Sequence, residues 1–190
     1  MKLFFADTET TGLDPRKHEM FQFAFIIEID GKIVEEVNIT MRPTNPEAVT
    51  QEALDITKKT IEEIMAYQDP KEAYKQVVAI LAKYIDKFDK TDKFVWIGQN
   101  PTFDTGFVRV FFKRAGDNYF GSWFRSVPTD LISFVTIMSL KGYLDLPNFK
   151  LGTICEALKI KLNAHDALDD VRATREAFHI LLDKVPECTS

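Results

Sequence analysis

The sequence predicts an α/β fold in which helices flank a mixed β-sheet. Three observations support this prediction. Short apolar and aromatic runs separated by turn residues fill the first forty positions, helix-start signals dominate from residue 45 onward, and one apolar run at 94–98 interrupts the helical part. This order of elements is typical of a sheet whose first three strands are antiparallel and whose later strands are parallel.

Turn residues delimit the N-terminal strands. Residues 2–6 are apolar and precede a Thr/Gly-rich turn at 10–12, which predicts a buried strand followed by a tight loop. A second run, 20–29, ends at Asp30-Gly31, and further apolar residues follow. Because Asp-Gly between two such runs is a strong hairpin signal, we expect three antiparallel strands over residues 2–41.

Helix starts mark most of the remaining elements. Asn45-Pro46 predicts an N-cap with proline at the first helical position, and Thr60 with Glu63 has the sequence of a capping box. Asn100-Pro101 predicts another helix start, with that helix reaching Ala115. Further helices are expected over 70–88, 129–140, about 150–158 and 166–184, with a loop over 116–125.

Composition limits the class of protein. The 190 residues, 45% hydrophobic and 28% charged, have the balance of one soluble globular domain, expected over 1–184 with a short tail over 185–190. A chain of this size buries a sufficient core without disulfides or a structural metal, so a metal would serve chemistry. Cys155 and Cys188 lie far apart and fit no metal-ligand spacing. With no signal peptide or membrane span in the sequence, we expect a cytoplasmic protein without a membrane partner.

The acidic excess directs attention to local carboxylate clusters. With 24 Lys and Arg against 29 Asp and Glu, the net charge of −5 predicts no broad attraction to nucleic acid. Carboxylates converging on one site would repel a phosphate substrate unless divalent cations lay between them. Asp7 and Glu9 are two residues apart at the end of the first strand, so both side chains are expected on one side of the sheet. The alternative is that they begin a solvated turn.

Two helices each add an acid near their start. Asp104 shares a stripe with Phe107 and Phe111, where a charge is costly unless it is paired, hydrogen-bonded or bound to metal. The alternative is a first-turn acid that the helix dipole favours. In the last helix, Asp170 lies on the buried flank, about 60° around the axis from Ala167.

A histidine immediately precedes that last helix. Asp166 is expected to cap the helix and Asp169 to point outward, so His165 belongs to the loop and can lean over the same cavity as Asp170. Four acids and one imidazole suit two hard cations with oxygen ligands, a set that drives in-line displacement at phosphorus. His165 is the predicted base that removes the proton from water.

Three segments carry a family resemblance. They are Phe5-Ala6-Asp7-Thr8-Glu9-Thr10-Thr11-Gly12-Leu13, Gly98-Gln99-Asn100-Pro101-Thr102-Phe103-Asp104 and His165-Asp166-Ala167-Leu168-Asp169-Asp170. In this order and spacing, the chain resembles the DnaQ-like 3′-5′ exonucleases of the DEDDh type, in the ribonuclease H-like superfamily, over nearly its whole length. The resemblance implies hydrolysis of single-stranded nucleic acid from its 3′ end with release of nucleoside 5′-monophosphates, in proofreading, repair or 3′-end trimming.

The resemblance also implies a role for each site residue. Asp7 would bridge two Mg²⁺ or Mn²⁺ ions, Glu9 and Asp170 would complete the ion that carries the nucleophilic water, and Asp104 would hold the second ion largely through water. His165 would be the general base. The residues expected to bind substrate are Thr8, Thr10, Thr11, Gly12, Leu13, Asn100 and Phe103, with a core role as the alternative for Phe103.

The chain departs from the family pattern at Gln99, where His is common. We expect altered local contacts or substrate preference there, with metal binding retained. Single-stranded DNA is favoured as partner, with an exoribonuclease of the same fold as the alternative. Because the sequence ends soon after its last helix, we expect either a stand-alone enzyme or a domain that associates with a polymerase through its surface, without support from a tail. Three alternative classes of protein fit the filled acid and histidine positions less well. They are a binding module without turnover, a ribonuclease H-type endonuclease and a haloacid-type phosphatase.

Overall fold

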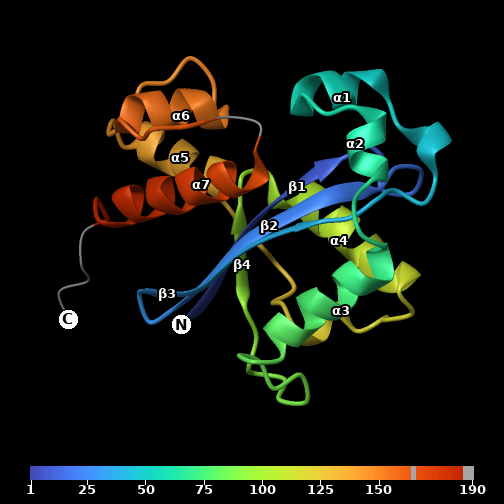
Figure 1. The fold of residues 1–190 in the computed structure, drawn as a ribbon. Coiled ribbons are helices and arrows are strands. Elements are labelled where there is room, and N and C mark those ends of the chain that lie inside the picture. Colours follow the sequence, from blue (N-terminus) through green and yellow to red (C-terminus); the bar gives the residue numbers. More distant parts are fainter. Residues whose placement is uncertain (164–165, 186–190) are drawn as a thin grey trace.

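The sheet has five strands in the order β3-β2-β1-β4-β5. The computed structural model describes residues 1–163 and 166–185, and Figure 1 shows the strands running through the centre of the molecule. Strand β1 is antiparallel to β2 and β2 to β3, whereas β4 is parallel to β1 and β5 to β4. The predicted mixed sheet is therefore confirmed. The strands are β1 (Lys2–Thr10), β2 (Met20–Ile29), β3 (Lys32–Thr40), β4 (Val95–Gly98) and β5 (Thr129–Asp130).

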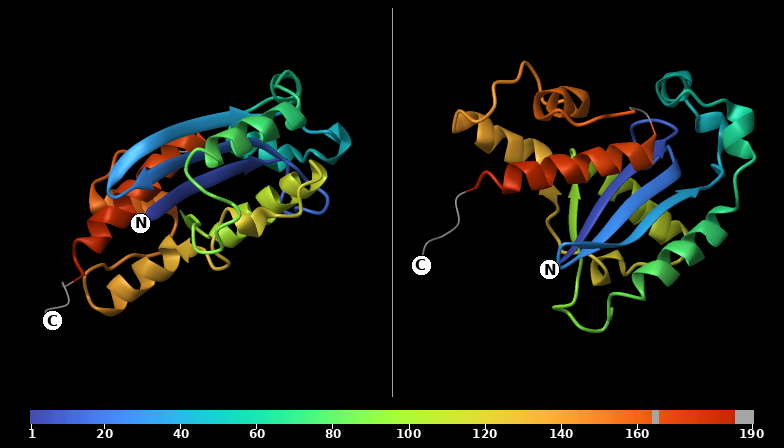
Figure 2. Two further views of the ribbon diagram at one scale, coloured as in Figure 1. Left: turned by 90° about the horizontal axis from the view of Figure 1, so that it is seen from below. Right: turned by 60° about the vertical axis from the view of Figure 1, so that its left-hand side comes forward.

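Helices cover both faces of this sheet. Helices α3 and α4 pack on one face, and α7 crosses the other, with α5 and α6 packed on α7 (Figures 1 and 2). Within the described ranges, no helix is long and apolar enough to cross a membrane. The helices are η1 (Pro46–Ala48), α1 (Gln51–Thr57), α2 (Ile61–Met65), α3 (Pro70–Leu81), α4 (Pro101–Arg114), η2 (Phe120–Ser122), α5 (Leu131–Leu140), α6 (Leu151–Leu158) and α7 (Ala167–Leu182).

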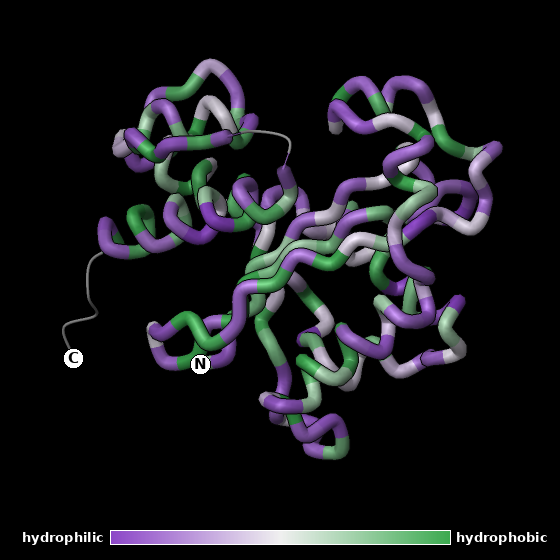
Figure 3. The backbone as a smooth tube through the Cα atoms, in the orientation of Figure 1, coloured by the Kyte–Doolittle hydropathy of each residue, from purple (hydrophilic) through white to green (hydrophobic). Residues whose placement is uncertain are grey.

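Alternation along β1 divides its side chains between the two layers. Phe4 is fully buried in the larger core with α3 and α4, while Phe5 is fully buried against Ala167 and Val171 of α7. Burying one such ring contributes about 1.5–3 kcal/mol, so packing on both faces fixes this strand. Figure 3 shows hydrophobic residues along the central strands. The last residues of β1 continue the alternation, and this decides where their side chains point.

Strand β1 is longer than the apolar run that predicts it. It continues to Thr10 because residues 7–9 remain paired with residues 22–24 of β2. The helix predicted over 70–88 ends at Leu81 instead. Beyond it, Asp86 and Asp89 each accept a hydrogen bond from the main-chain N–H two residues later, and these bonds stabilise turns in place of further helix.

Helix starts agree with the sequence where side-chain hydrogen bonds form them. Thr60 and Glu63 make the predicted capping box. Asn45 makes no side-chain cap and precedes only a 3₁₀ turn, and Asn100 adopts a left-handed φ of 54° without a side-chain cap. The helix predicted from residue 129 begins two residues later, because Thr129–Asp130 pair with β4.

Candidate active site

Three carboxylates from two layers meet at the end of β1. Asp7 and Glu9 lie on the α7 side of the strand, and Asp170 comes from the first turn of α7. One oxygen from each of the three side chains lies within 4.8 Å of the other two. We call these residues the acid triad. The structure thus brings together three of the four acids that the sequence singles out.

Burial and mutual repulsion dominate the electrostatics of the acid triad. The pKa of Asp7 is raised well above its ordinary value by burial and then by the charges of Asp104, Glu9 and Asp170. Burial also raises the pKa of Glu9 to about 7, with Asp170 as the next contributor and the Lys59 ammonium opposing it. Acids this close are costly to ionise together unless a cation joins them. The donor set, three carboxylate oxygens, is the one that hard divalent cations prefer.

Asp104 approaches the same strand from the other layer. It lies in the first turn of α4, is only 3% exposed, and accepts hydrogen bonds from Thr8 N at 2.9 Å and Thr8 Oγ1 at 2.7 Å. Burial raises the pKa of Asp104 to about 7, against the lowering effect of the two Thr8 bonds. Because its charge raises the pKa values of Asp7 and Glu9, Asp104 belongs to the same electrostatic site although it lies outside the acid triad.

The start of α7 is arranged largely as the sequence predicts. Asp166 caps the helix by accepting from Leu168 N at 3.0 Å, and Asp169 pairs with Arg172 at 2.8 Å. Neither belongs to the acid triad, whereas Asp170 does. His165, the predicted base, lies outside the described residues.

Two neighbours of the acid triad escape sequence reasoning. Lys59, in the turn between α1 and α2, is close enough to lower the pKa of Glu9. Cys155 of α6 is buried, and burial followed by the charge of Asp170 raises the pKa of its thiol to about 11. Neither belongs to the three motif segments, and no local pattern signals either one.

The segment after β1 forms a compact loop held by its own polar groups. Thr10 Oγ1 donates to Gly12 O at 2.8 Å, and Thr11 Oγ1 accepts from Glu19 N at 3.0 Å. Thr8, Thr10 and Thr11 are buried, so these predicted substrate residues have structural uses for their hydroxyls. Leu13, in contrast, is 76% exposed.

Glycine is required in this loop for reasons of space. A Cβ atom at Gly12 would lie 2.5–2.7 Å from ring atoms of His18. The His18 ring is held in place because its Nδ1 accepts a hydrogen bond from Asp14 N at 3.0 Å. A residue with a Cβ atom at position 12 would therefore clash with the His18 ring, and only glycine lets the main chain lie this close to it.

The other two predicted substrate residues lie at the start of α4. The main-chain N–H of Asn100 donates to Asp130 Oδ1 at 3.0 Å, which joins the end of β4 to β5. Phe103 is half-buried, and its ring lies 5.0 Å from that of Phe107. The role of Phe103 in substrate binding stays a prediction.

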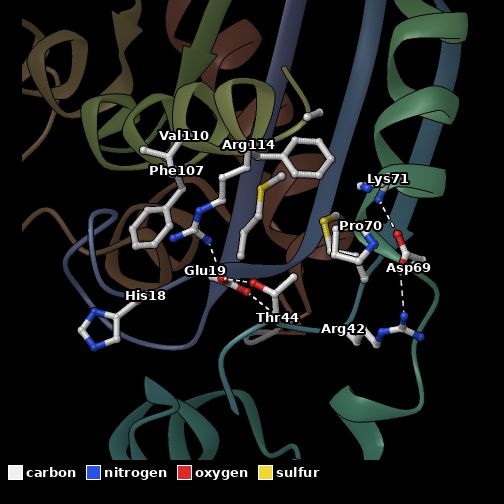
Figure 4. Close-up of a pocket in the computed structure, with 14 residues that line it drawn as sticks. His18, Glu19, Arg42, Thr44, Asp69, Pro70, Lys71, Phe107, Val110 and Arg114 are labelled. Carbon is white, nitrogen blue, oxygen red and sulfur yellow. Dashed lines mark hydrogen bonds and ion pairs between the residues drawn. The ribbon is translucent and has the colours of Figure 1, made fainter. Parts of the chain in front are cut away.

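A cavity of about 160 Å³ lies on the α4 face of the sheet, opposite the side to which the acid triad points. Figure 4 shows Glu19 at its wall, in contact with Arg114 and Thr44. Arg114 pairs with Glu19 at 2.5 Å and Arg42 with Asp69 at 2.7 Å. These two ion pairs in the cavity wall connect α4 and the start of α3 to the strands.

A family model matches nearly the whole chain: residues 4–178 match RNase_T, described as Exonuclease. The PolC-type DNA polymerase III of Caldanaerobacter subterraneus subsp. tengcongensis is 29% identical over 183 residues, which is 95% of this chain and 12% of the relative. The PolC-type DNA polymerase III of Thermotoga petrophila is 24% identical over 173 residues, 90% of this chain and 11% of the relative. The chain therefore corresponds to a small part of these longer proteins.

Solved structures share the fold. Exonuclease I of E. coli in complex with a dT13 oligonucleotide has a TM-score of 0.79 and 22% identity, over 97% of this chain and 41% of that chain. Exonuclease I from Methylocaldum szegediense has a TM-score of 0.80 and 23% identity, over 98% of this chain and 41% of that chain. The resemblance to DnaQ-like exonucleases predicted from the three motifs is confirmed, and the chain belongs to the RNase_T exonuclease family.

Proposed function

We propose that this chain is a metal-dependent 3′-5′ exonuclease domain that removes nucleoside 5′-monophosphates from single-stranded nucleic acid, with DNA preferred over RNA. The observation that carries the proposal is the acid triad, which gathers Asp7, Glu9 and Asp170 within 4.8 Å at a strand end. Membership of an exonuclease family supports the reaction class. The names of the PolC-type relatives and the oligonucleotide in the exonuclease I complex support DNA as the substrate.

The acid triad and Asp104 are the proposed ligands of two Mg²⁺ or Mn²⁺ ions. Asp7, Glu9 and Asp170 would hold one ion, and Asp7 and Asp104 would hold the second. Such ions make water more acidic and offset charge that develops on the phosphoryl oxygens. The raised pKa values of Glu9 and Asp104 support this assignment, because bound cations would stabilise the ionised carboxylates that burial disfavours.

The protein groups have separate proposed tasks. His165 takes a proton from the attacking water, whose oxygen forms a bond to phosphorus while the bond from phosphorus to the 3′-oxygen of the preceding nucleotide breaks; that oxygen then gains a proton from solvent. Thr8 orients Asp104 through its two hydrogen bonds. The exposed Leu13 contacts the terminal base, and the main chain of the loop around Gly12 lies along its sugar.

A labelled-strand assay tests the proposal. Matched DNA and RNA oligonucleotides, each labelled at the 5′ end, are incubated with the protein and Mg²⁺ or Mn²⁺. We expect a ladder of products that shortens from the 3′ end by one nucleotide at a time, faster on DNA. Faster loss of RNA would establish the exoribonuclease alternative, and intact strands of both kinds with both metals would overturn the proposal.

His165→Ala tests the proposed base. Loss of general base catalysis lowers the rate by about 100-fold or more. Mg²⁺ should still stabilise the fold of this variant, because His165 is not a proposed metal ligand. Thermal unfolding with and without Mg²⁺ measures this stabilisation. Asp169→Asn is the matched control, because Asp169 lies beside the site but pairs with Arg172 instead. Turnover near that of the control would remove the assignment of the base.

A further inference from the structure

Gln99 joins the end of β4 to the connection between α5 and α6. Its Nε2 donates to the main-chain oxygen of Phe149 at 2.6 Å, across fifty residues of chain. Gln99 immediately follows β4, which ends at Gly98. Phe5 pairs in parallel with Ile97, and this register continued by two residues would bring Gln99 level with Asp7. Because adjacent strands lie about 4.8 Å apart, this register would put Gln99 beside the strand end that carries Asp7.

The face on which Gln99 lies follows from the same alternation. Ile97 is buried with Phe5, Ala167 and Val171 on the α7 side of the sheet. Alternation continued by two residues would direct Gln99 to the same side, and its bond to Phe149, which packs with α5, α6 and α7, agrees with this. Gln99 is half-buried there, and its carboxamide spans from the strand edge to the layer formed by α5, α6 and α7.

The α5–α6 connection, residues 141–150, depends on a small number of anchors. Most of its residues are exposed, and half-buried Leu144, Leu146 and Phe149 pack on the apolar cluster of α5, α6 and α7. Asn148 accepts from Lys150 N at 3.0 Å and from Thr153 Oγ1 of α6 at 2.8 Å, so these bonds join the segment only to itself and to the next helix. The Gln99 bond is different in kind, because it fixes the end of the segment to the sheet beside the acid triad.

We propose that Gln99 is a positioning residue that holds the α5–α6 connection as a fixed side wall for the substrate strand at the acid triad. This inference rests on the proposed nuclease function. Gln99 acts on the substrate through the α5–α6 connection, because its Nε2 donates to the main-chain oxygen of Phe149. Loosening the wall costs affinity, since the segment must then be ordered when the strand binds.

Two variants at this position separate hydrogen bonding from shape. Gln99→Met keeps a similar length and removes the donor, while Gln99→His restores a donor nitrogen at the same number of bonds from Cβ. Gln68→Met is the matched control, because Gln68 Nε2 makes an equivalent bond to the main-chain oxygen of Thr40 at 3.0 Å, away from the site. In Gln99→Met we expect KM for a single-stranded oligonucleotide to rise at least three-fold with kcat within two-fold of wild type. Gln99→His should return KM to within two-fold.

Two further measurements keep this test independent of turnover. Hydrogen–deuterium exchange of residues 144–150 should be at least ten-fold faster in Gln99→Met and unchanged in Gln68→Met. The Kd for a labelled oligonucleotide in Ca²⁺ should rise with KM. Unchanged exchange would overturn the positioning role of Gln99. Faster exchange with unchanged Kd would overturn the proposal that the α5–α6 connection forms a side wall for the substrate strand. If wild type fails to degrade either nucleic acid, the proposed function fails, and exchange together with Kd still decides the role of Gln99.

Discussion

The metal-free protein should lose stability as the pH rises from 5 to 8. Glu9 has a pKa of about 7 in the folded protein, against an ordinary value of 4.5 that applies after unfolding. Between these values the folded state holds more protons than the unfolded state. The stability that this difference contributes is fully present below pH 4.5 and is lost as the pH rises through 7. Asp104, whose folded pKa is also about 7, acts in the same direction.

The expected effect is large enough to measure. At about 1.4 kcal/mol per pH unit, a rise in pKa from 4.5 to about 7 corresponds to about 3 kcal/mol for Glu9. For a domain of this size, that amounts to a change in Tm of about 6–12 °C. Surface pairs do not cancel it: hydrogen bonds from Arg16 lower the pKa of Asp14 to about 2, so Asp14 affects stability at lower pH.

Thermal unfolding in EDTA at pH 5, 6, 7 and 8 tests this prediction. Glu9→Gln should flatten the fall in Tm, because it removes the titrating group and one charge of the acid triad. Saturating Mg²⁺ should flatten it in wild type, because the bound cation stabilises ionised carboxylates. Glu52→Gln on α1 is a control that should keep the wild-type profile. A Tm that rises with pH in EDTA, or an equal slope in Glu9→Gln, would refute the reasoning.

Three further substitutions probe separate contacts. Mg²⁺ at one hundred times its Kd should stabilise the wild type by about 2.7 kcal/mol, and Asp170→Asn should abolish most of this stabilisation. Asp169→Asn should keep it. Equal Tm shifts in the two variants would exclude Asp170 as a ligand. Thr8→Val removes one hydrogen bond to the buried carboxylate of Asp104, so the unfolding free energy should drop by about 1 kcal/mol. The pH–rate profile should also move to higher pH, and an unmoved profile contradicts this. Gly12→Ala brings a methyl group against the His18 ring and should lower the unfolding free energy, measured by chemical denaturation, by about 1–3 kcal/mol. The double variant that adds His18→Ala should recover this stability. No recovery would mean that the strain lies elsewhere.

Local periodicity accounts for what the sequence predicts correctly. A period of two places Asp7 and Glu9 on one side of β1, and helical spacing places Asp170 on the buried flank of α7; both directions are confirmed by the geometry of the acid triad. Asp104 is likewise buried, as its place on the apolar stripe indicates. Each of these inferences needs only the geometry of one element. The side chains then meet because the sheet order puts β1 next to β4 and under α7.

Long-range contacts account for what the sequence does not predict. Strand β5 has only two residues, too few for any periodic signal, and it exists because Thr129–Asp130 pair with the end of β4. Lys59 approaches Glu9 through the packing of a turn whose local sequence specifies only a helix start. The bond from Gln99 to Phe149 joins segments fifty residues apart. In each case the partner is chosen by tertiary structure, which no pattern within a single segment encodes.

Thr8 shows how one strand serves both layers at the site. It stands between Asp7 and Glu9, so alternation sends its side chain to the α4 face while theirs point to α7. There its hydroxyl and its main-chain N–H both donate to Asp104. A carboxylate on the far face is therefore attached to the strand segment that carries two members of the acid triad. Because β1 is packed on both sides, a shift of α4 relative to this strand end would strain the two Thr8 bonds before it could separate the acids.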